Sequence, residues 1–284
     1  MRRIFLLCFV AVVMHVQLAY AEEKEITWYH ANFPPGFINV GPMKGDGYEN
    51  YLENLLREEL NDYHHTYQIG NYGRILEKIE SGNACCVALI RTEEREKFIE
   101  YSYPTMIALA NGLFIESKRI EEFKPFINDD GYISIERLFG KSDLRMGVSK
   151  GRRYHGAVDT ILNDNPDSKK IVIRSGEDVL KGLLNMLGAG RNVDYVIGYP
   201  HEIRWLNYRE ELKGNFTFIP ILEMPQYVIS QIGCSKNAWG KEVIHRINQV
   251  LANGYIPEYK ERYQRFLPPE AVALHEKYIK EVFP

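Results

Sequence analysis

One uninterrupted apolar run, Ala84–Ile90, restricts the fold of this chain more than any other stretch. Its length suits a strand, and apolar side chains at every position are typical of a strand buried on both faces of a parallel sheet. The residues before it predict strands at Ile26–His30 and 66–69. Helices are predicted from Tyr48 onward and around Ile75. The alternation of strands and helices continues along the chain and predicts α/β layers with ligand sites at the carboxyl ends of strands.

The N-terminus has the three parts of a cleavable signal peptide. Arg2 and Arg3 are followed by the apolar stretch 4–16 and by the small residues Ala19 and Ala21. This pattern predicts a signal peptide over residues 1–21, with cleavage after Ala21. The apolar stretch is shorter than the roughly 20 residues that span a bilayer. We therefore expect an exported, soluble, periplasmic protein.

The charge balance bears on possible partners. The chain has 35 Lys and Arg and 38 Asp and Glu, and loss of Arg2 and Arg3 leaves 33 − 38 = −5. A net negative charge argues against nucleic acid or an anionic membrane surface as partner. No His or Cys pair has the spacing of a zinc site, so neither a metal nor a cofactor is predicted.

Charged residues follow two of the predicted strands. After Ala84–Ile90 come Arg91 and Arg95, and Thr92 between them is a good N-cap for a helix. After a predicted strand at 144–149 come Arg152 and Arg153, which we expect to open a second helix. Helix N-termini attract anions through their free N–H groups, so basic residues there suggest a bound anion.

Several motifs occur in an order that extends over nearly the whole mature chain. They are NFPPGF, GYENYLENLLREEL, ILEKIESGNACCVALIRTEEREKFIEYSYP, LRMGVSKGRRY, GRNVDYVIGY and INQVLANGYIPEYKERY. In order and spacing they resemble the type II periplasmic solute-binding proteins of family 3, the amino-acid-binding group of ABC importers. The resemblance implies two α/β lobes, joined by crossovers near Phe114–Ser117 and Phe216–Pro225, which close on a ligand. One lobe would contain residues 22–115 and 223–284, and the other residues 116–222.

The resemblance assigns a role to the arginine of the Thr-x-x-Arg motif, here Arg95. In the family this side chain grips the ligand's carboxylate, and its planar fork suits two charge-assisted hydrogen bonds. The alternative is a surface arginine that pairs with Glu94 or Glu96. Arg91 is a second candidate on this lobe. Arg152 and Arg153 would face the ligand from the other lobe, or point into solvent.

The chain departs from the family pattern at the site for the ligand's ammonium. Tyr199 stands where a carboxylate is usual, and Glu202 is the nearest substitute. This change favours an anionic ligand, such as a carboxylate without an ammonium, over an α-amino acid. Phe33, Tyr103 and Tyr199 are candidate aromatic walls of the cleft, or ordinary packing residues.

Three cysteines remain after export, and the oxidising compartment permits a disulfide. Cys85 and Cys86 are neighbours on one strand and point to opposite faces. Either could reach Cys234 on the predicted strand 226–234, or all three could be buried free thiols.

The resemblance implies a monomeric solute-binding protein that delivers its ligand to an ABC importer. A sensor module that presents its ligand to a membrane receptor is an alternative. A third is a periplasmic enzyme on the same fold, similar to the cyclohexadienyl dehydratases, with His30, His155 or Glu202 as acid or base. No nucleophile elbow, paired carboxylates or metal cluster appears in the sequence, so the binding functions are favoured.

Overall fold

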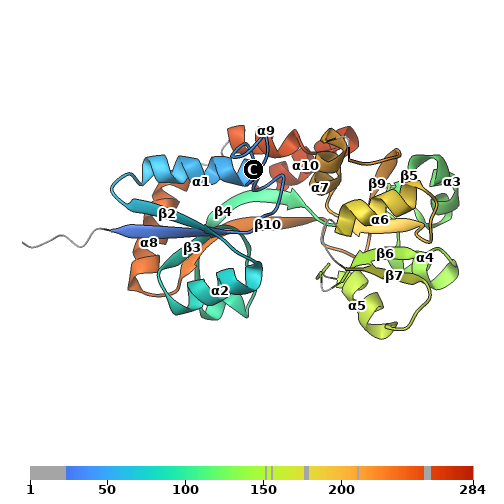
Figure 1. Cartoon of the computed structure of the whole chain (residues 1–284), viewed down its shortest axis with the longest axis horizontal. Helices are drawn as coiled ribbons and strands as arrows, with labels where there is room; N and C mark the ends of the chain where they lie inside the picture. Colours follow the sequence, from blue (N-terminus) through green and yellow to red (C-terminus); the bar gives the residue numbers. More distant parts are fainter. Residues whose placement is uncertain are drawn as a thin grey trace, which may run out of the picture.

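The computed structural model describes residues 24–150, 152–154, 156–175, 179–209, 211–252 and 257–283. The expected signal peptide, with its cleavage after Ala21, lies outside these residues, as does His155. The described chain forms two lobes, each built on a five-stranded sheet (Figure 1). Within the described residues, no helix combines the length and the apolar character that crossing a membrane requires.

The first sheet has the order β2-β1-β3-β10-β4. Its strands are β1 (Glu25–His30), β2 (His64–Ile69), β3 (Ala84–Ile90), β4 (Ile99–Leu109) and β10 (Tyr227–Ser235). Helices α1 (Tyr48–Glu59) and α2 (Tyr72–Ser81) cover opposite faces of this sheet (Figure 1). Helix α8 (Ala238–Leu251) packs on β4 and β10.

The apolar run forms β3 with the predicted bounds and lies near the middle of the first sheet. It pairs in parallel with β1 but antiparallel with β10. The expectation of a parallel sheet was therefore correct on one side of β3 only. The reason is that β10 enters the sheet from the second lobe and runs in the opposite direction.

The second sheet has the order β7-β6-β8-β5-β9. Its strands are β5 (Gly112–Glu116), β6 (Met146–Ser149), β7 (Ile171–Arg174), β8 (Tyr195–Gly198) and β9 (Phe216–Pro220). The helices of this lobe are α3 (Ile120–Phe123), α4 (Ile135–Lys141), α5 (Gly156–Asp164), α6 (Val179–Gly188) and α7 (Pro200–Tyr208).

The chain crosses between the sheets twice. It leaves the first sheet after Leu109 and enters the second at Gly112, and it returns between Pro220 and Tyr227. The first crossing comes earlier than the expected 114–117, because Gly112–Glu116 already pairs with β9. We therefore propose a lobe boundary near residues 110–111 rather than 115.

The C-terminal helices α9 (Pro257–Gln264) and α10 (Pro269–Val282) connect the lobes on the side of the crossings (Figure 1). The Trp205 ring on α7 lies 5.8 Å from that of Phe266. Both residues belong to a buried apolar cluster that also contains Trp28 of β1 and Phe218 of β9. This side of the molecule is therefore packed continuously from one lobe to the other.

A disulfide joins the central strand of the first sheet, β3, to its neighbour β10. Cys85 and Cys234 are register partners on β3 and β10 and are bonded to each other. Cys86 faces the opposite side of the sheet as a free, buried thiol, and burial raises its pKa.

Thiol titration of the mature protein should reflect this pairing. After denaturation without reductant we expect one reactive thiol, from Cys86, and after reduction three. Three thiols before reduction would contradict the disulfide.

Helix α1 carries two buried carboxylates, Glu49 and Glu53. Glu53 Oε2 lies 3.1 Å from His30 Nδ1, and the Tyr259 hydroxyl donates a hydrogen bond to Glu49 Oε2 at 2.6 Å. Burial raises the pKa of Glu49 to about 7 against the opposing effect of this hydrogen bond, and the charge of Glu53 adds to the rise. The folded state therefore holds a proton on Glu49 that the unfolded chain releases above about pH 4.5.

Glu49→Gln should remove this pH dependence. The wild type loses stability as pH rises from about 4.5 to about 7, and a shift of this size corresponds to about 3 kcal/mol. Glutamine keeps the shape and can still accept the hydrogen bond from Tyr259. Urea unfolding at about pH 4 and about pH 8 gives the difference in unfolding free energy between the variant and the wild type. From the lower to the higher pH, this difference should change in favour of the variant by up to about 3 kcal/mol. An equal difference at both pH values would refute the assignment.

Candidate functional site

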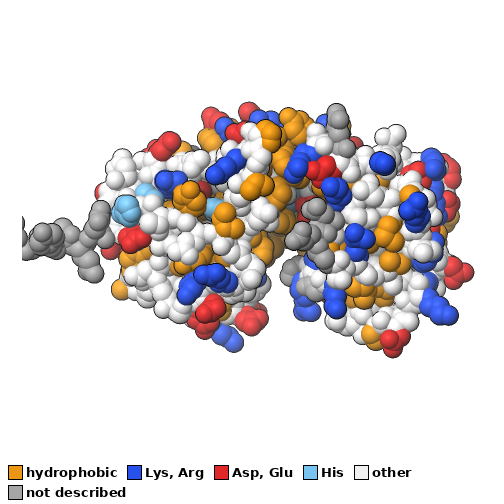
Figure 2. Space-filling view, in the orientation of Figure 1, with side chains coloured by type: hydrophobic (Ala, Val, Ile, Leu, Met, Phe, Trp, Pro, Cys, Tyr) orange, Lys and Arg blue, Asp and Glu red, His pale blue; other side chains and the backbone are white. Residues whose placement is uncertain are grey.

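A cleft separates the lobes on the side away from α9 and α10 (Figure 2). Next to the crossing segments lies a cavity of about 1010 Å³. Ligand pockets range from about 300 to 1,000 Å³, so this open cavity is at the upper limit. Residues of both lobes line it, among them Arg91, Tyr101, Tyr103, Asn111, Tyr154 and Tyr199.

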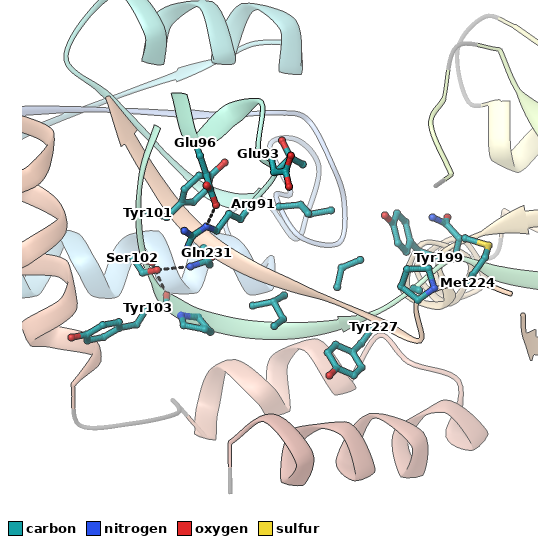
Figure 3. Close-up of a pocket in the computed structure, with 18 of the residues that line it drawn as sticks. Arg91, Glu93, Glu96, Tyr101, Ser102, Tyr103, Tyr199, Met224, Tyr227 and Gln231 are labelled. Atoms are coloured by element: carbon teal, nitrogen blue, oxygen red, sulfur yellow. Dashed lines mark hydrogen bonds and ion pairs between the residues drawn. The ribbon is translucent and has the colours of Figure 1, made fainter. Parts of the chain in front are cut away.

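Arg91 and two tyrosines form the wall on the first lobe. Arg91 Nε donates a hydrogen bond to the Glu96 carboxylate, and its guanidinium lies 5.9 Å from the centre of the Tyr101 ring (Figure 3). Tyr103 exposes its side chain, while its backbone N–H donates to Asn248 Oδ1 at 2.8 Å. Both sequence candidates on this wall, Arg91 and Tyr103, therefore line the cavity.

Arg95 lies on a single turn of 3-10 helix, Arg95–Lys97, rather than in the expected α-helix after Thr92. The turn is short because β4 begins at Ile99. The Arg95 backbone N–H donates to Thr92 Oγ1 at 3.3 Å, and its side-chain Nη1 donates to the carbonyl of Ile90 at 2.9 Å.

The surroundings of Arg95 differ from those of a surface ion pair. Of the two acids that could have paired with it, Glu96 bonds Arg91 instead. Among the described residues, no carboxylate is within ion-pair distance of Arg95. Ile90, whose carbonyl holds it, lines the cavity, whereas Arg95 stands just behind the lining. Among the described residues, the bond to Ile90 is the hydrogen bond that its guanidinium makes.

An ion pair stands behind the wall of the second lobe. Arg152 Nη1 and Nη2 donate to Glu202 Oε1 and Oε2 at 3.1 and 2.6 Å, so the contact is bidentate. Arg152 Nη2 also donates to Asn111 Oδ1, at 3.3 Å, at the first crossing. The guanidinium lies 5.4 and 5.2 Å from the ring centres of Tyr154 and Tyr199, which line the cavity.

Both partners of this pair are charged. Burial acts to raise the pKa of Glu202, but the adjacent Arg152 outweighs it and the pKa is lowered. Burial opposes the charge of Arg152 as well, and Glu202 reverses the effect so that the pKa of Arg152 is raised. The Tyr199 backbone N–H also donates to Glu202 Oε2, at 3.2 Å, which caps α7. Glu202 is therefore committed within the protein and is not a free acid for a ligand's ammonium.

Arg153 has a different position. It is highly exposed, and its nearest acid is Asp159 at 3.5 Å. Because α5 begins at Gly156, Arg152 and Arg153 precede this helix and do not open it. The prediction of a helix N-terminus at these arginines was wrong, since the chain continues as a loop through Tyr154 before α5.

The aromatic candidates Phe33 and Tyr199 meet at a contact between the lobes. The Phe33 ring lies edge-on to Tyr199 at 6.4 Å and to His201 at 6.0 Å. Tyr199 lines the cavity, whereas Phe33 is not among its lining residues. His201 is buried, and burial lowers its pKa to about 4.

Sequence reasoning missed Asn111, Tyr154 and Tyr101 as cleft residues. Asn111 had one usable signal, its position in the short Ala-Asn-Gly link between two apolar segments. The hydroxyl of Tyr101 is buried without a hydrogen-bond partner, and burial raises its pKa.

Among the described residues, no group of three or more His, Cys, Asp or Glu side chains is placed to hold a metal ion.

Solved structures of low sequence identity have the same arrangement. The probable amino-acid ABC transporter extracellular-binding protein YtmK of Bacillus subtilis is similar at a TM-score of 0.61 and 14% identity, over 86% of this chain and 98% of that one. The second substrate-binding domain of GlnP from Lactococcus lactis, in an open conformation, gives 0.56 and 15%, over 87% and 96%. A histidine kinase sensor domain with similarity to periplasmic binding proteins gives 0.57 and 13%, over 87% and 98%.

These similarities define the class of fold. The chain has the two-lobed α/β fold of the type II periplasmic binding proteins, with the cavity between the lobes. No family model matches the chain, and no curated protein sequence matches it.

Proposed function

We propose that this protein is an exported solute-binding protein that traps a small ligand with a carboxylate or other anionic group between its two lobes. The observation that carries the proposal is a cavity lined by residues of both lobes at the two crossings, with Arg91 in its wall and Arg95 bonded to the lining residue Ile90. Arginine binds carboxylates through paired, charge-assisted hydrogen bonds. The protein would act in the periplasm as a monomer, after removal of residues 1–21, and deliver its ligand to an ABC importer.

A sensor role is the second candidate, supported by the similarity to the histidine kinase sensor domain. A sensor would bind its ligand in the same cleft and present the closed form to a membrane receptor. The two roles share the binding step and differ in the partner that recognises closure.

The enzyme alternative lacks support at two of its three candidate residues. His30 is buried against Glu53 and is not among the residues that line the cavity. Glu202 is held by Arg152. His155 lies outside the described residues. We therefore propose binding rather than catalysis as the function of the cleft.

Native mass spectrometry of freshly purified protein tests the proposal. We expect a fraction of the molecules to carry one small organic acid, because closed lobes release ligand slowly. Unfolding and refolding in clean buffer should remove this mass, and addition of the released compound should restore it. Protein that carries no adduct, and acquires none from an extract of small metabolites, would contradict the proposal.

A further inference from the structure

The Arg152–Glu202 pair lies behind the cavity wall of the second lobe, next to the lining residues Tyr154 and Tyr199. Arg152 donates hydrogen bonds to both carboxylate oxygens of Glu202 and to the side-chain oxygen of Asn111. Its guanidinium packs against Tyr154 and Tyr199, two tyrosines that line the cavity. The side chains of Arg152 and Glu202 are 20% and 14% exposed, so water screens the pair weakly.

We propose that Arg152 is a specificity residue that takes the place of a ligand's ammonium group, and that the ligand is an aromatic acid without a cationic group. The inference rests on the proposed function and names the ligand class of the same cleft. A ligand ammonium that approached Glu202 would find both oxygens in use and a guanidinium beside it. Its desolvation would then be uncompensated, which disfavours binding.

The remaining acids of the cavity do not replace Glu202. Glu96 lines the cavity but is bonded to Arg91. Glu93 also lines it and is exposed, and exposed carboxylates contribute little to binding because solvent screens them. The cavity thus offers an amino group no buried, unpaired acceptor charge among its described residues.

The residues that line the cavity favour a ligand with an aromatic ring. Five tyrosines line it: Tyr101, Tyr103, Tyr154, Tyr199 and Tyr227. Tyrosine rings offer flat apolar surface with a polar tip. The hydroxyl of Tyr101 is buried and has no hydrogen-bond partner in the described part of the chain. Met224 and Tyr199 face Tyr101 and Tyr103 across the cavity (Figure 3).

A matched pair of probes tests the inference by calorimetry at about pH 8. 3-Phenylpropanoate and L-phenylalanine differ only in the α-ammonium, and butanoate lacks the ring. We expect ligand-free wild type to bind phenylpropanoate at least about tenfold more tightly than either of the others. Arg152→Met should free Glu202 and improve the affinity for phenylalanine, relative to phenylpropanoate, by at least about tenfold.

The double variant Arg152→Met/Glu202→Gln is the control for folding and charge. It removes both charges, so it avoids the unpaired buried carboxylate that destabilises the single variant. It should keep the wild-type preference for phenylpropanoate, and circular dichroism should show both variants folded. If Arg152→Met does not fold, the double variant still tests the inference. Tighter binding of phenylalanine than of phenylpropanoate by the double variant would overturn the role of Glu202.

Other outcomes would overturn the inference directly. They are equal or tighter binding of phenylalanine by wild type, an unchanged preference in folded Arg152→Met, or no binding of phenylpropanoate. Failure of the proposed function would look different, since the protein would then carry no ligand after purification and would bind no compound from the extract. In that case both proposals fall.

Discussion

Replacing Arg95 with alanine is expected to weaken ligand binding by at least about thirtyfold. Truncating one partner of a buried charge-assisted pair costs roughly 2–5 kcal/mol, and each 1.4 kcal/mol is about tenfold in affinity. Arg95 has no carboxylate partner among the described residues, and its side chain is oriented by the carbonyl of Ile90 at the cavity wall. The measurement is calorimetry with the compound that native mass spectrometry identifies.

Two further variants separate a ligand contact from a general charge effect. Arg95→Lys should recover only part of the affinity, because a point charge cannot reproduce the planar fork. Arg153→Ala is the matched control, since Arg153 is exposed and pairs with Asp159. It should change the affinity by less than about twofold. If Arg95→Ala binds like wild type, Arg95 has no role in the site.

Removing the disulfide should have the largest effect on stability. Cys85 and Cys234 are 149 residues apart, so the bond closes a loop that contains the whole second lobe. Chain-entropy arguments and measured cases give about 2–5 kcal/mol for loss of a native disulfide, with the larger values for long loops. The Cys85→Ala/Cys234→Ala variant should therefore unfold at a clearly lower urea concentration than the oxidised wild type.

Cys86→Ala is the control for this experiment. It removes a buried thiol next to Cys85 but no cross-link. We expect it to be less destabilised than the double variant, and reduction should lower the stability of Cys86→Ala but not of the double variant. Equal unfolding midpoints for the oxidised wild type and the double variant would contradict the stabilising role of the bond.

Several elements of the first lobe, among them β1, α1, α2 and β3, could be predicted from local pattern. The run Ala84–Ile90 became β3 because each of its side chains meets buried apolar surface or a neighbouring strand. Which of Cys85 and Cys86 forms the disulfide with Cys234 could not be predicted from local pattern. It depends on the register of β10, which shifts between Gln231 and Gly233 and brings Cys234 opposite Cys85.

The charged residues of the cleft show where sequence reasoning ends. Arg152 and Glu202 were each recognised as candidates, but as separate contacts to a ligand. Their pairing depends on the path of the loop after β6, which places residues 50 positions apart in direct contact. The turn at Arg95 was similarly misjudged, because the start of β4 and not the N-cap of Thr92 decides how far the helix continues.

The most direct test of the account is whether the lobes close on the ligand. Small-angle X-ray scattering should compare refolded, ligand-free protein with the same protein saturated with the identified compound. The open cleft between the lobes (Figure 2) leaves room for closure about the segments 110–111 and 221–226. We predict a smaller radius of gyration with ligand, and no such change for Arg95→Ala at the same ligand concentration. An unchanged radius for wild type under saturating ligand would contradict the proposed trapping mechanism.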